Sequence, residues 1–425
     1  MNKKQTVAFH TLGCKLNFSE TSSLSRLLEQ EGFEKRDFTD LADVYVINTC
    51  SVTDNADKEC RQLVRRIQRK APDSFVVVTG CYAQLKPAEI ANIPGVDLVL
   101  GAAEKFNIVR HISTLTKTND AARICSCDIG EVSGFNASFS QNDRTRSFLK
   151  VQDGCDYNCS FCTIPMARGK SRSDVVVNVV KHAQDLAADG VKEIVLTGVN
   201  LGDFGKGPDG DRKYDENFTG LVKALDAVSG IDRYRISSIE PNLLTSELIE
   251  WVANSDQFMP HFHIPLQSGS NEILGMMRRR YKRELYAERV QLIKQLMPHA
   301  AIGVDVIVGF PGETDEHFRE TFDFLHALDV SYLHVFTYSE RDHTKALEFK
   351  PVVPVYIRNE RNKALRNLSF MKLQYFTNQH AGETRKVLFE AFNKDGMMEG
   401  YTDNYIRVST PFRPEWANQL VDWKL

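Results

Sequence analysis

The sequence predicts an α/β protein in three parts: an N-terminal parallel α/β domain, a central partial (β/α)6 barrel and a small C-terminal β-barrel. Two observations lead to this prediction. Short apolar runs alternate with amphipathic helical segments along most of the 425 residues, which is the pattern of parallel sheets covered by helices. A polar stretch interrupts the alternation, and the alternation stops near residue 380. We therefore expect domains at residues 1–113, 144–379 and 380–425, with a linker at 114–143.

The elements of the first domain are predicted from buried apolar runs and from helical spacing of leucines. Its strands are expected at 7–11, 43–48 and 74–79, and its helices at 19–31 and 54–70. Pro87 suits the first turn of a further helix. A short strand at 123–127 is expected inside the linker.

The central domain repeats the strand–helix unit about six times. Its strands are expected at 148–152, 193–197, 234–238, 261–266, 301–308 and 332–337, with helices at 175–189, 284–296, 316–328 and 356–380. Right-handed crossovers between parallel strands close such units toward a barrel, whose active site lies at the carboxyl ends of the strands. Short strands at 387–391 and 404–408 are expected in the last domain.

Composition and charge restrict the class of protein. The net charge of −3 argues against a general polyanion binder, although a local basic patch is compatible with it. The polar N-terminus lacks the pattern of a signal peptide, and no apolar run is long enough for a membrane helix. We therefore expect a cytoplasmic protein without membrane contact, whose nine cysteines stay reduced.

Three cysteines each follow the end of a predicted strand in the first domain: Cys14 in TLGC, Cys50 in INTC and Cys81 in VTGC. The ends of parallel strands share one edge, where open α/β sheets bind ligands. We therefore expect these thiols, the first triad, to converge on an iron–sulfur cluster with one open iron. Two alternatives stay open here, namely three inert buried thiols or a zinc site completed by His10.

The segment GCDYNCSFCTIP places Cys155, Cys159 and Cys162, the second triad, after the first barrel strand with C-x3-C-x2-C spacing. A short loop can wrap three thiolates around one cluster and leave the fourth iron free for a chelating ligand. S-adenosylmethionine (SAM) offers an amino group and a carboxylate for this, and radical chemistry is assigned to such cofactors. A zinc knuckle is the alternative. Tyr157 and Phe161, between the cysteines, are expected to contact the cofactor.

Small and polar residues follow the other barrel strands, as expected for a polar ligand at the barrel mouth. Each motif alone is weak, because a glycine after a strand is usually a turn. The residues expected to bind SAM are Gly198, Asn200, Ser238, Glu240, Gln267, Ser268 and Gly309.

These motifs resemble the methylthiotransferases, radical SAM enzymes that insert a methylthio group into an unactivated C–H bond. The resemblance covers nearly the whole chain and is carried by TLGCKLN, INTCSVT, TGCYAQ, FLKVQDGCDYNCSFCTIPMARGKSRS, LTGVNLGDFG, HIPLQSGS, MRRRY and DVIVGFPGET. It implies that the second triad holds the radical-generating 4Fe–4S cluster. It also implies that the first triad holds an auxiliary 4Fe–4S cluster carrying the sulfur, which one SAM methylates while another supplies the radical.

The resemblance further implies that the C-terminal domain is the substrate-binding module of the family, called TRAM. The branch acting on threonylcarbamoyladenosine next to the tRNA anticodon is indicated by TLGCKLN and RYRISSIEPN. One departure is that Glu340, Asp342 and His343 stand where the family more often has a turn with proline and glycine. The expected partners are tRNA, SAM and an electron donor, and the chain is expected to be a monomer.

An RNA substrate makes basic clusters candidate phosphate contacts, with a solvated surface as the alternative. Arg61, Arg65 and Arg69 recur at i, i+4 on one predicted helix. The other expected RNA contacts are Arg278, Arg279 and Arg385. Cys60, Cys125 and Cys127 lie outside both triads and are expected to be inert.

Competing functions remain at this level. The same chemistry on isopentenyladenosine in tRNA, or on an aspartate of a ribosomal protein, is one alternative. A non-catalytic, metal-bearing RNA-binding protein is another, which predicts bound zinc and no cleavage of SAM.

Overall fold

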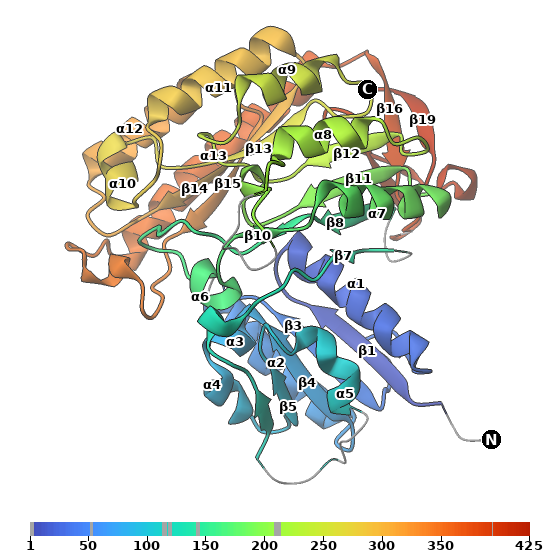
Figure 1. The fold of residues 1–425 in the computed structure, drawn as a ribbon. Helices are drawn as coiled ribbons and strands as arrows, with labels where there is room; N and C mark the ends of the chain where they lie inside the picture. The colour runs from blue at the N-terminus through green and yellow to red at the C-terminus, as the bar shows by residue number, and fades with distance from the viewer. Residues whose placement is uncertain are drawn as a thin grey trace.

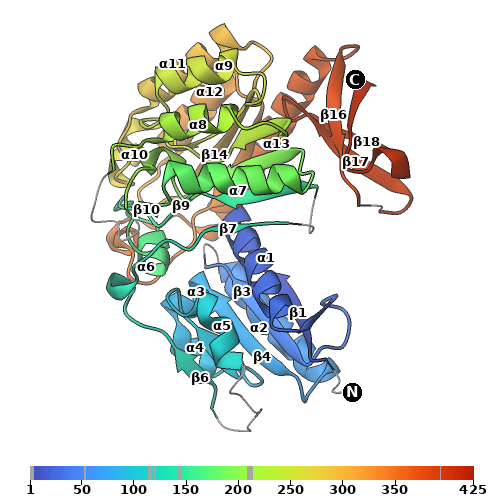
Figure 2. The same cartoon turned by 45° about the vertical axis from the view of Figure 1, so that its right-hand side comes forward.

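The computed structural model describes residues 4–51, 54–112, 117, 121–141, 145–207, 214–392 and 394–425. Its α/β architecture confirms the predicted fold class (Figure 1). The N-terminal α/β domain lies below the central barrel, and the C-terminal sheet packs against one side of the barrel (Figures 1 and 2). In the described part of the chain, no helix combines the length and the apolar character that crossing a bilayer requires.

The first domain is a six-stranded parallel sheet with helices on both faces. Its strands, in the order β2-β1-β3-β4-β5-β6, are β2 (Glu34–Arg36), β1 (Thr6–Thr11), β3 (Val44–Thr49), β4 (Phe75–Gly80), β5 (Leu98–Leu100) and β6 (Arg123–Cys125). Helices α1 (Lys15–Gln30) and α5 (Ile108–Ile112) cover one face, and α2 (Asp54–Lys70), α3 (Cys81–Leu85) and α4 (Pro87–Ala91) cover the other. The sequence missed the short β5, and it placed the start of α1 four residues late.

The segment predicted as a linker contributes to both sheets. Strand β6 pairs in parallel with β5, and β7 (Ser138–Phe139) pairs antiparallel with β8 (Arg146–Lys150) of the barrel. The polar stretch therefore crosses from one sheet to the other and adds an edge strand to each.

The barrel has six parallel strands in chain order. They are β8, β11 (Glu193–Thr197), β12 (Arg233–Ile236), β13 (His261–Gln267), β14 (Ala301–Val308) and β15 (Tyr332–Thr337). Only isolated bridges, including Ser238 to His263, join β12 to β13. The helices are α6 (Ile164–Arg168), α7 (Val176–Ala188), α8 (Phe218–Asp226), α9 (Ser246–Asn254), α10 (Asn271–Met276), α11 (Arg283–Leu296), α12 (Asp315–Ala327) and α13 (Val355–Gln379). Two short strands, β9 (Gln152–Asp153) and β10 (Arg172–Ser173), form a hairpin around α6.

The C-terminal module is a four-stranded antiparallel sheet. Its order is β18-β17-β16-β19, with β16 (Thr384–Phe389), β17 (Met397–Thr402), β18 (Arg407–Pro411) and β19 (Leu420–Lys424). The strand expected at 404–408 begins three residues later, as β18, after a turn. Arginines of β12 hold the module: Arg233 donates to the carbonyl of Lys386 at 2.7 Å, and Arg235 donates to the carbonyl of Thr402 at 2.7 Å. The backbone of the module therefore takes part in its docking on the barrel.

A buried ion cluster joins the first domain to the barrel. Glu20 of α1 accepts from Lys105 at 2.6 Å, from Lys150 of β8 at 3.2 Å and from Arg168 of α6 at 3.1 Å. Arg168 also donates to Asp153 at 2.9 Å. The surrounding cations hold the pKa of Glu20 well below its usual range. Because each charge is desolvated, the cluster is stable only when all of its members are present.

A second contact between these parts comes from the loop where the sequence departs from the family. Arg341 donates to Asp57 of α2 at 2.9 Å, and Asp342 pairs with Lys86 at 2.8 Å. Glu340 pairs with Arg358 at 2.5 Å inside the barrel domain. The charged residues that replace a turn therefore join the barrel to the first domain.

We predict that Glu20→Gln lowers the free energy of unfolding by about 3 kcal/mol at neutral pH, because three buried cations lose their shared anion. A carboxylate whose folded pKa is depressed stabilises the fold above its unfolded pKa, and this stabilisation is lost as the pH falls through the folded pKa. The difference from wild type should therefore shrink in acid. Urea unfolding measures both effects. Glu31→Gln, at an exposed position after α1, is the control, and equal stability of Glu20→Gln and wild type would refute the role of this cluster.

Candidate active site

The first triad lies at the carboxyl edge of the N-terminal sheet. Cys14 follows β1, Cys50 follows β3 and Cys81 begins α3 after β4, and these three strands are neighbours in the sheet. The strand order reverses between β1 and β3, and such switch points are where open α/β sheets bind ligands. The structure therefore brings the predicted residues to one place.

Local packing brings the cysteine loops together. Gly13 has φ +101°, and a Cβ there would lie 2.5 Å from the Cβ of Cys50, so only glycine lets these loops touch. The Asn17 amide donates to the carbonyls of Leu12 and Thr49, each at 2.9 Å. Burial raises the pKa of the Cys81 thiol, while Arg168 opposes that rise.

The second triad lies in the loop between β9 and α6, and hydrogen-bond donors point at its sulfurs. The amide of Tyr157 donates to Sγ of Cys155 at 3.4 Å, and that of Ile164 donates to Sγ of Cys162 at 3.4 Å. The guanidinium of Arg279 donates to Sγ of Cys159 at 3.1 Å. Burial raises the pKa of Cys155 and Cys162 to about 12. The free thiols are therefore protonated, and the site favours thiolates only with a bound cation.

In neither triad do all three sulfurs lie within 4.8 Å of one another. Among the described residues, only His263, Asp305 and His334 bring three ligand atoms within 4.8 Å of one another. A zinc ion holds each thiolate sulfur at about 2.3 Å, which requires closely spaced sulfurs. His10, considered as a fourth zinc ligand, instead packs against Phe38 at 4.7 Å between ring centroids. The spacing and the chemistry of the donors suit a polynuclear iron–sulfur cluster.

Several residues expected to bind SAM surround the second triad. Gln267 and Phe161 line a cavity of about 220 Å³ together with Cys162. Asn200 is buried, and neither polar atom of its side chain has a hydrogen-bond partner among the described residues. A buried amide without a partner is costly, so Asn200 fits a polar ligand that supplies the missing bonds. Gly198 packs against the Gln152 side chain, with its virtual Cβ 2.9 Å from Oε1.

The polar groups of other predicted SAM contacts form hydrogen bonds or ion pairs with neighbouring protein groups. Ser238 shares a 2.7 Å hydrogen bond with His263. Tyr157 accepts from Asn242 at 2.9 Å, and Glu240 is paired with Arg279. The same holds for Ser268 and Gly309, whose direct contact with SAM stays a prediction. Ser268 is fully buried and bonded to Thr321, while Gly309, at φ +75°, donates its amide to Glu313.

Some of the arginines predicted to contact RNA are exposed, and others are already paired with carboxylates of the protein. Arg65 and Arg69 of α2 and Arg278 are exposed. Arg61 donates to Glu89 at 3.0 Å, and Arg385 binds Asp403 through two nitrogens.

Arg279 requires a correction. Its side chain is 4% exposed and its guanidinium is committed to Cys159 and Glu240. It therefore belongs to the second triad and not to an RNA-binding surface. The basic run at 278–280 does not reveal which of its arginines points inward.

Of the cysteines expected to be inert, Cys60 lies in the core of the first domain, where burial raises its pKa to about 12. Cys125 and Cys127 are half-buried.

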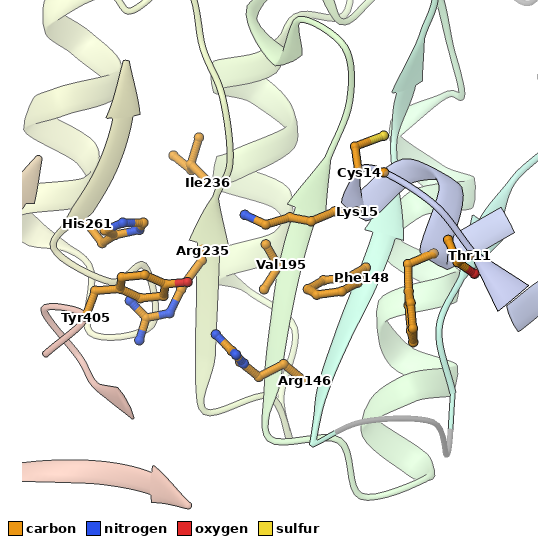
Figure 3. A pocket seen from close by; sticks show the side chains of 12 residues that line it. Thr11, Cys14, Lys15, Arg146, Phe148, Val195, Arg235, Ile236, His261 and Tyr405 are labelled. Atoms are coloured by element: carbon orange, nitrogen blue, oxygen red, sulfur yellow. The ribbon is translucent and has the colours of Figure 1, made fainter. Parts of the chain in front are cut away.

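A cavity of about 290 Å³ lies where the three parts of the molecule meet (Figure 3). Cys14 and Lys15 reach it from the first domain, Arg235 and His261 from the barrel, and Tyr405 from the C-terminal module. Lys15 is accessible to solvent inside the cavity yet lies deep among protein atoms, and this desolvation lowers its pKa. Sequence reasoning did not select Lys15, although it directly follows a triad cysteine.

Comparisons with known proteins agree with this geometry. Residues 149–325 match the radical SAM superfamily, and residues 6–101 match uncharacterized protein family UPF0004. The chain is 44% identical to the threonylcarbamoyladenosine tRNA methylthiotransferase MtaB of Bacillus subtilis, over 99% of this chain and 93% of the relative. It is 40% identical to the Aquifex aeolicus enzyme of the same name, over 95% and 96% of the two chains.

A further relative has a different substrate in its name. The chain is 28% identical to a tRNA-2-methylthio-N(6)-dimethylallyladenosine synthase of Staphylococcus epidermidis, over 100% of this chain and 83% of the relative. Among solved structures, the radical SAM methyltransferase TsrM of Kitasatospora setae aligns with a TM-score of 0.58 at 16% identity, over 78% of this chain and 73% of TsrM. That likeness concerns the fold alone.

We predict that Gly13→Ala lowers the iron content of the first triad, because the added methyl group would collide with Cys50, 2.8 Å from its sulfur. Gly32→Ala is a matched control, since Gly32 has a similar φ of +92° and nothing within 4 Å of its virtual Cβ. After anaerobic reconstitution, iron per chain in Gly13→Ala should fall toward that of Cys50→Ala, and Gly32→Ala should keep the wild-type value. Wild-type iron in Gly13→Ala would contradict this.

Proposed function

We propose, from the premise that this chain belongs to the radical SAM methylthiotransferase family, that it adds a methylthio group to threonylcarbamoyladenosine next to the tRNA anticodon. The family assignment rests on relatives that are 34–44% identical over at least 95% of this chain. The observation that supports the reaction is the pair of open cysteine triads on two parallel sheets, held in one relative position by the Glu20 ion cluster. The relatives whose names contain threonylcarbamoyladenosine support the choice of this substrate.

Each triad has a separate role in the proposal. The second triad holds the cluster of the radical SAM superfamily, and the first holds an auxiliary cluster. When bound, the two 4Fe–4S clusters and SAM supply the electron, the deoxyadenosyl radical and the transferred sulfur. Arg279 and the amides of Tyr157 and Ile164 donate hydrogen bonds to the second triad, which stabilises negative charge on the sulfurs. Asn200 supplies its unpartnered amide to SAM.

The proposed function also requires contact with tRNA and with an electron donor. The exposed Arg65, Arg69 and Arg278 contact tRNA phosphates, because exposed guanidinium groups gain affinity through release of counterions. An external reductant supplies electrons to the second triad. The enzyme acts as a monomer in the cytoplasm, where tRNA is available.

We predict that the two triads separate into distinct phenotypes. Cys159→Ala should abolish reductive cleavage of SAM, since the second triad is then incomplete. Cys50→Ala should retain cleavage and lose methylthio product. Wild type should bind about eight irons, and each variant about half of them. Cys60→Ala, in the core, is the control that keeps both readouts. Product formation by Cys50→Ala would disprove the role of the first triad.

The substrate is tested by mass spectrometry of nucleosides from bulk tRNA of the source cell, with and without this gene. We expect methylthio-threonylcarbamoyladenosine to disappear and its unthiolated precursor to accumulate. If the dimethylallyl analogue were lost instead, the substrate would be wrong while the reaction class would stand. Unchanged tRNA would direct the search to a ribosomal protein.

A further inference from the structure

The geometry points to a carboxylate-binding site in the cavity where the three parts of the molecule meet, and we propose that Lys15 binds the carboxylate of the threonyl group on the substrate nucleoside. This inference rests on the proposed function and extends it to the residue that selects the substrate. The site is neither of the cysteine triads, although it adjoins Cys14 (Figure 3).

The ammonium of Lys15 is the uncompensated charge of this cavity. Two other cations line the cavity, and both are neutralised by protein: Arg235 donates to Glu193 at 2.8 Å, and Arg146 donates to Glu390 at 2.8 Å. Lys15 makes no salt bridge or hydrogen bond with any residue that the structure describes, and its side chain extends into the cavity toward Arg235 and Ile236 (Figure 3). A cation that lines a cavity without a protein anion beside it is available to pair with a negatively charged group of a ligand.

The walls of the cavity are built for a flat ligand with polar substituents. Phe18 and Phe148 form an edge-to-face pair at 5.6 Å on one side, and Tyr405 stacks on His261 at 4.2 Å on the other. Nδ1 of His261 is buried without a hydrogen-bond partner, which is a second polar group in the wall that protein atoms leave unsatisfied.

Backbone conformation shows that Tyr405 is held in place. Its φ is +69°, a conformation that residues other than glycine adopt at a cost. Packing on His261 and a cation–π contact with Arg235, 5.0 Å from the guanidinium carbon to the ring centroid, offset that cost. The C-terminal module thereby contributes a fixed wall to the cavity.

The chemistry of the nucleoside places its side chain near Lys15. The methylthio group is added at C2 of adenine, and the threonylcarbamoyl group is attached at N6. The carbons C2 and C6 flank the same ring nitrogen, so the N6 substituent lies on the same edge of the base as the carbon that receives sulfur. A residue next to Cys14 is therefore placed to contact the end of that substituent.

The same lysine discriminates against an apolar substituent. A dimethylallyl group in this cavity would desolvate the ammonium without providing an anion, and a buried polar group left unpaired disfavours the wrong ligand. Lys15 thus favours the threonyl carboxylate and disfavours the uncharged analogue.

The test compares two short anticodon stem–loop RNAs, one with threonylcarbamoyladenosine and one with the methyl ester of its threonyl group, by fluorescence anisotropy with the reconstituted full-length protein. Wild type should bind the acid about 10- to 100-fold more tightly than the ester, as expected for a charge-assisted hydrogen bond. Lys15→Met should lower affinity for the acid to that for the ester and leave the ester unchanged. Lys15→Arg should keep most of the preference. Lys181→Met, at an exposed position on α7, should behave as wild type.

Three results would overturn the inference. Wild type could bind acid and ester equally. Lys15→Met could weaken both RNAs by the same factor, which would assign the lysine to a phosphate. Lys15→Met could also lose iron, which would assign it to the neighbouring cluster. Failure of the proposed function has a different signature, namely turnover by wild type of dimethylallyladenosine RNA and not of threonylcarbamoyladenosine RNA.

Discussion

The relative position of the two triads depends on the ion pair between Glu20 and Arg168. Glu20 is on α1, the helix that begins directly after Cys14, and Arg168 ends α6, the helix that follows Cys162. Each residue of the pair therefore lies within about two helical turns of a triad cysteine, so the pair joins the two cysteine loops. Neither domain could rotate against the other without leaving charges buried and unpaired. Such separation would cost several kcal/mol, and the charge cluster therefore fixes the distance between the two triads.

Charged side chains are used in two different ways in this protein. In the Glu20 cluster, cations and anions are matched inside the fold, so the cluster is structural. At Lys15 the charge is not matched by the described residues, and the cation faces the cavity. Paired charges thus hold the domain interface in one place, while an unpaired group is available to a ligand in the other. Asn200, with its unpartnered amide, belongs to the second kind.

Much of the fold could be predicted because buried parallel strands are continuous apolar runs. The bounds of β11, β14 and β15 agree with the sequence prediction. The short β5 was missed because three residues give no periodicity, and α1 was started late because the packing of Phe18 in its first turn on Phe148 of the barrel is a tertiary contact that sequence cannot show. Both triads could be predicted, because cysteines that follow predicted strands, or that lie a few residues apart, form a pattern that is visible in the sequence.

The partners of charged residues could not be predicted in this way. Arg279 and Arg278 are adjacent in one basic run, yet one is bound to Cys159 and the other is exposed. Which of them points inward depends on the positive φ of Arg278, which turns the chain after α10. Glu20, Lys150 and Arg168 are far apart in sequence, and only the packing of α1 on β8 brings them together. The periodicity of a sequence indicates which face of a helix or strand is apolar, whereas tertiary contacts decide which charged residues form ion pairs.

The role of the C-terminal module follows from how it is attached. Its sheet is held through backbone carbonyls that accept from Arg233 and Arg235 and through side-chain contacts such as the ion pair of Arg146 with Glu390. Docking brings Tyr405, in the turn between β17 and β18, to the cavity where the three parts of the molecule meet. A single residue of the module therefore completes the wall of a cavity that the first domain and the barrel also line.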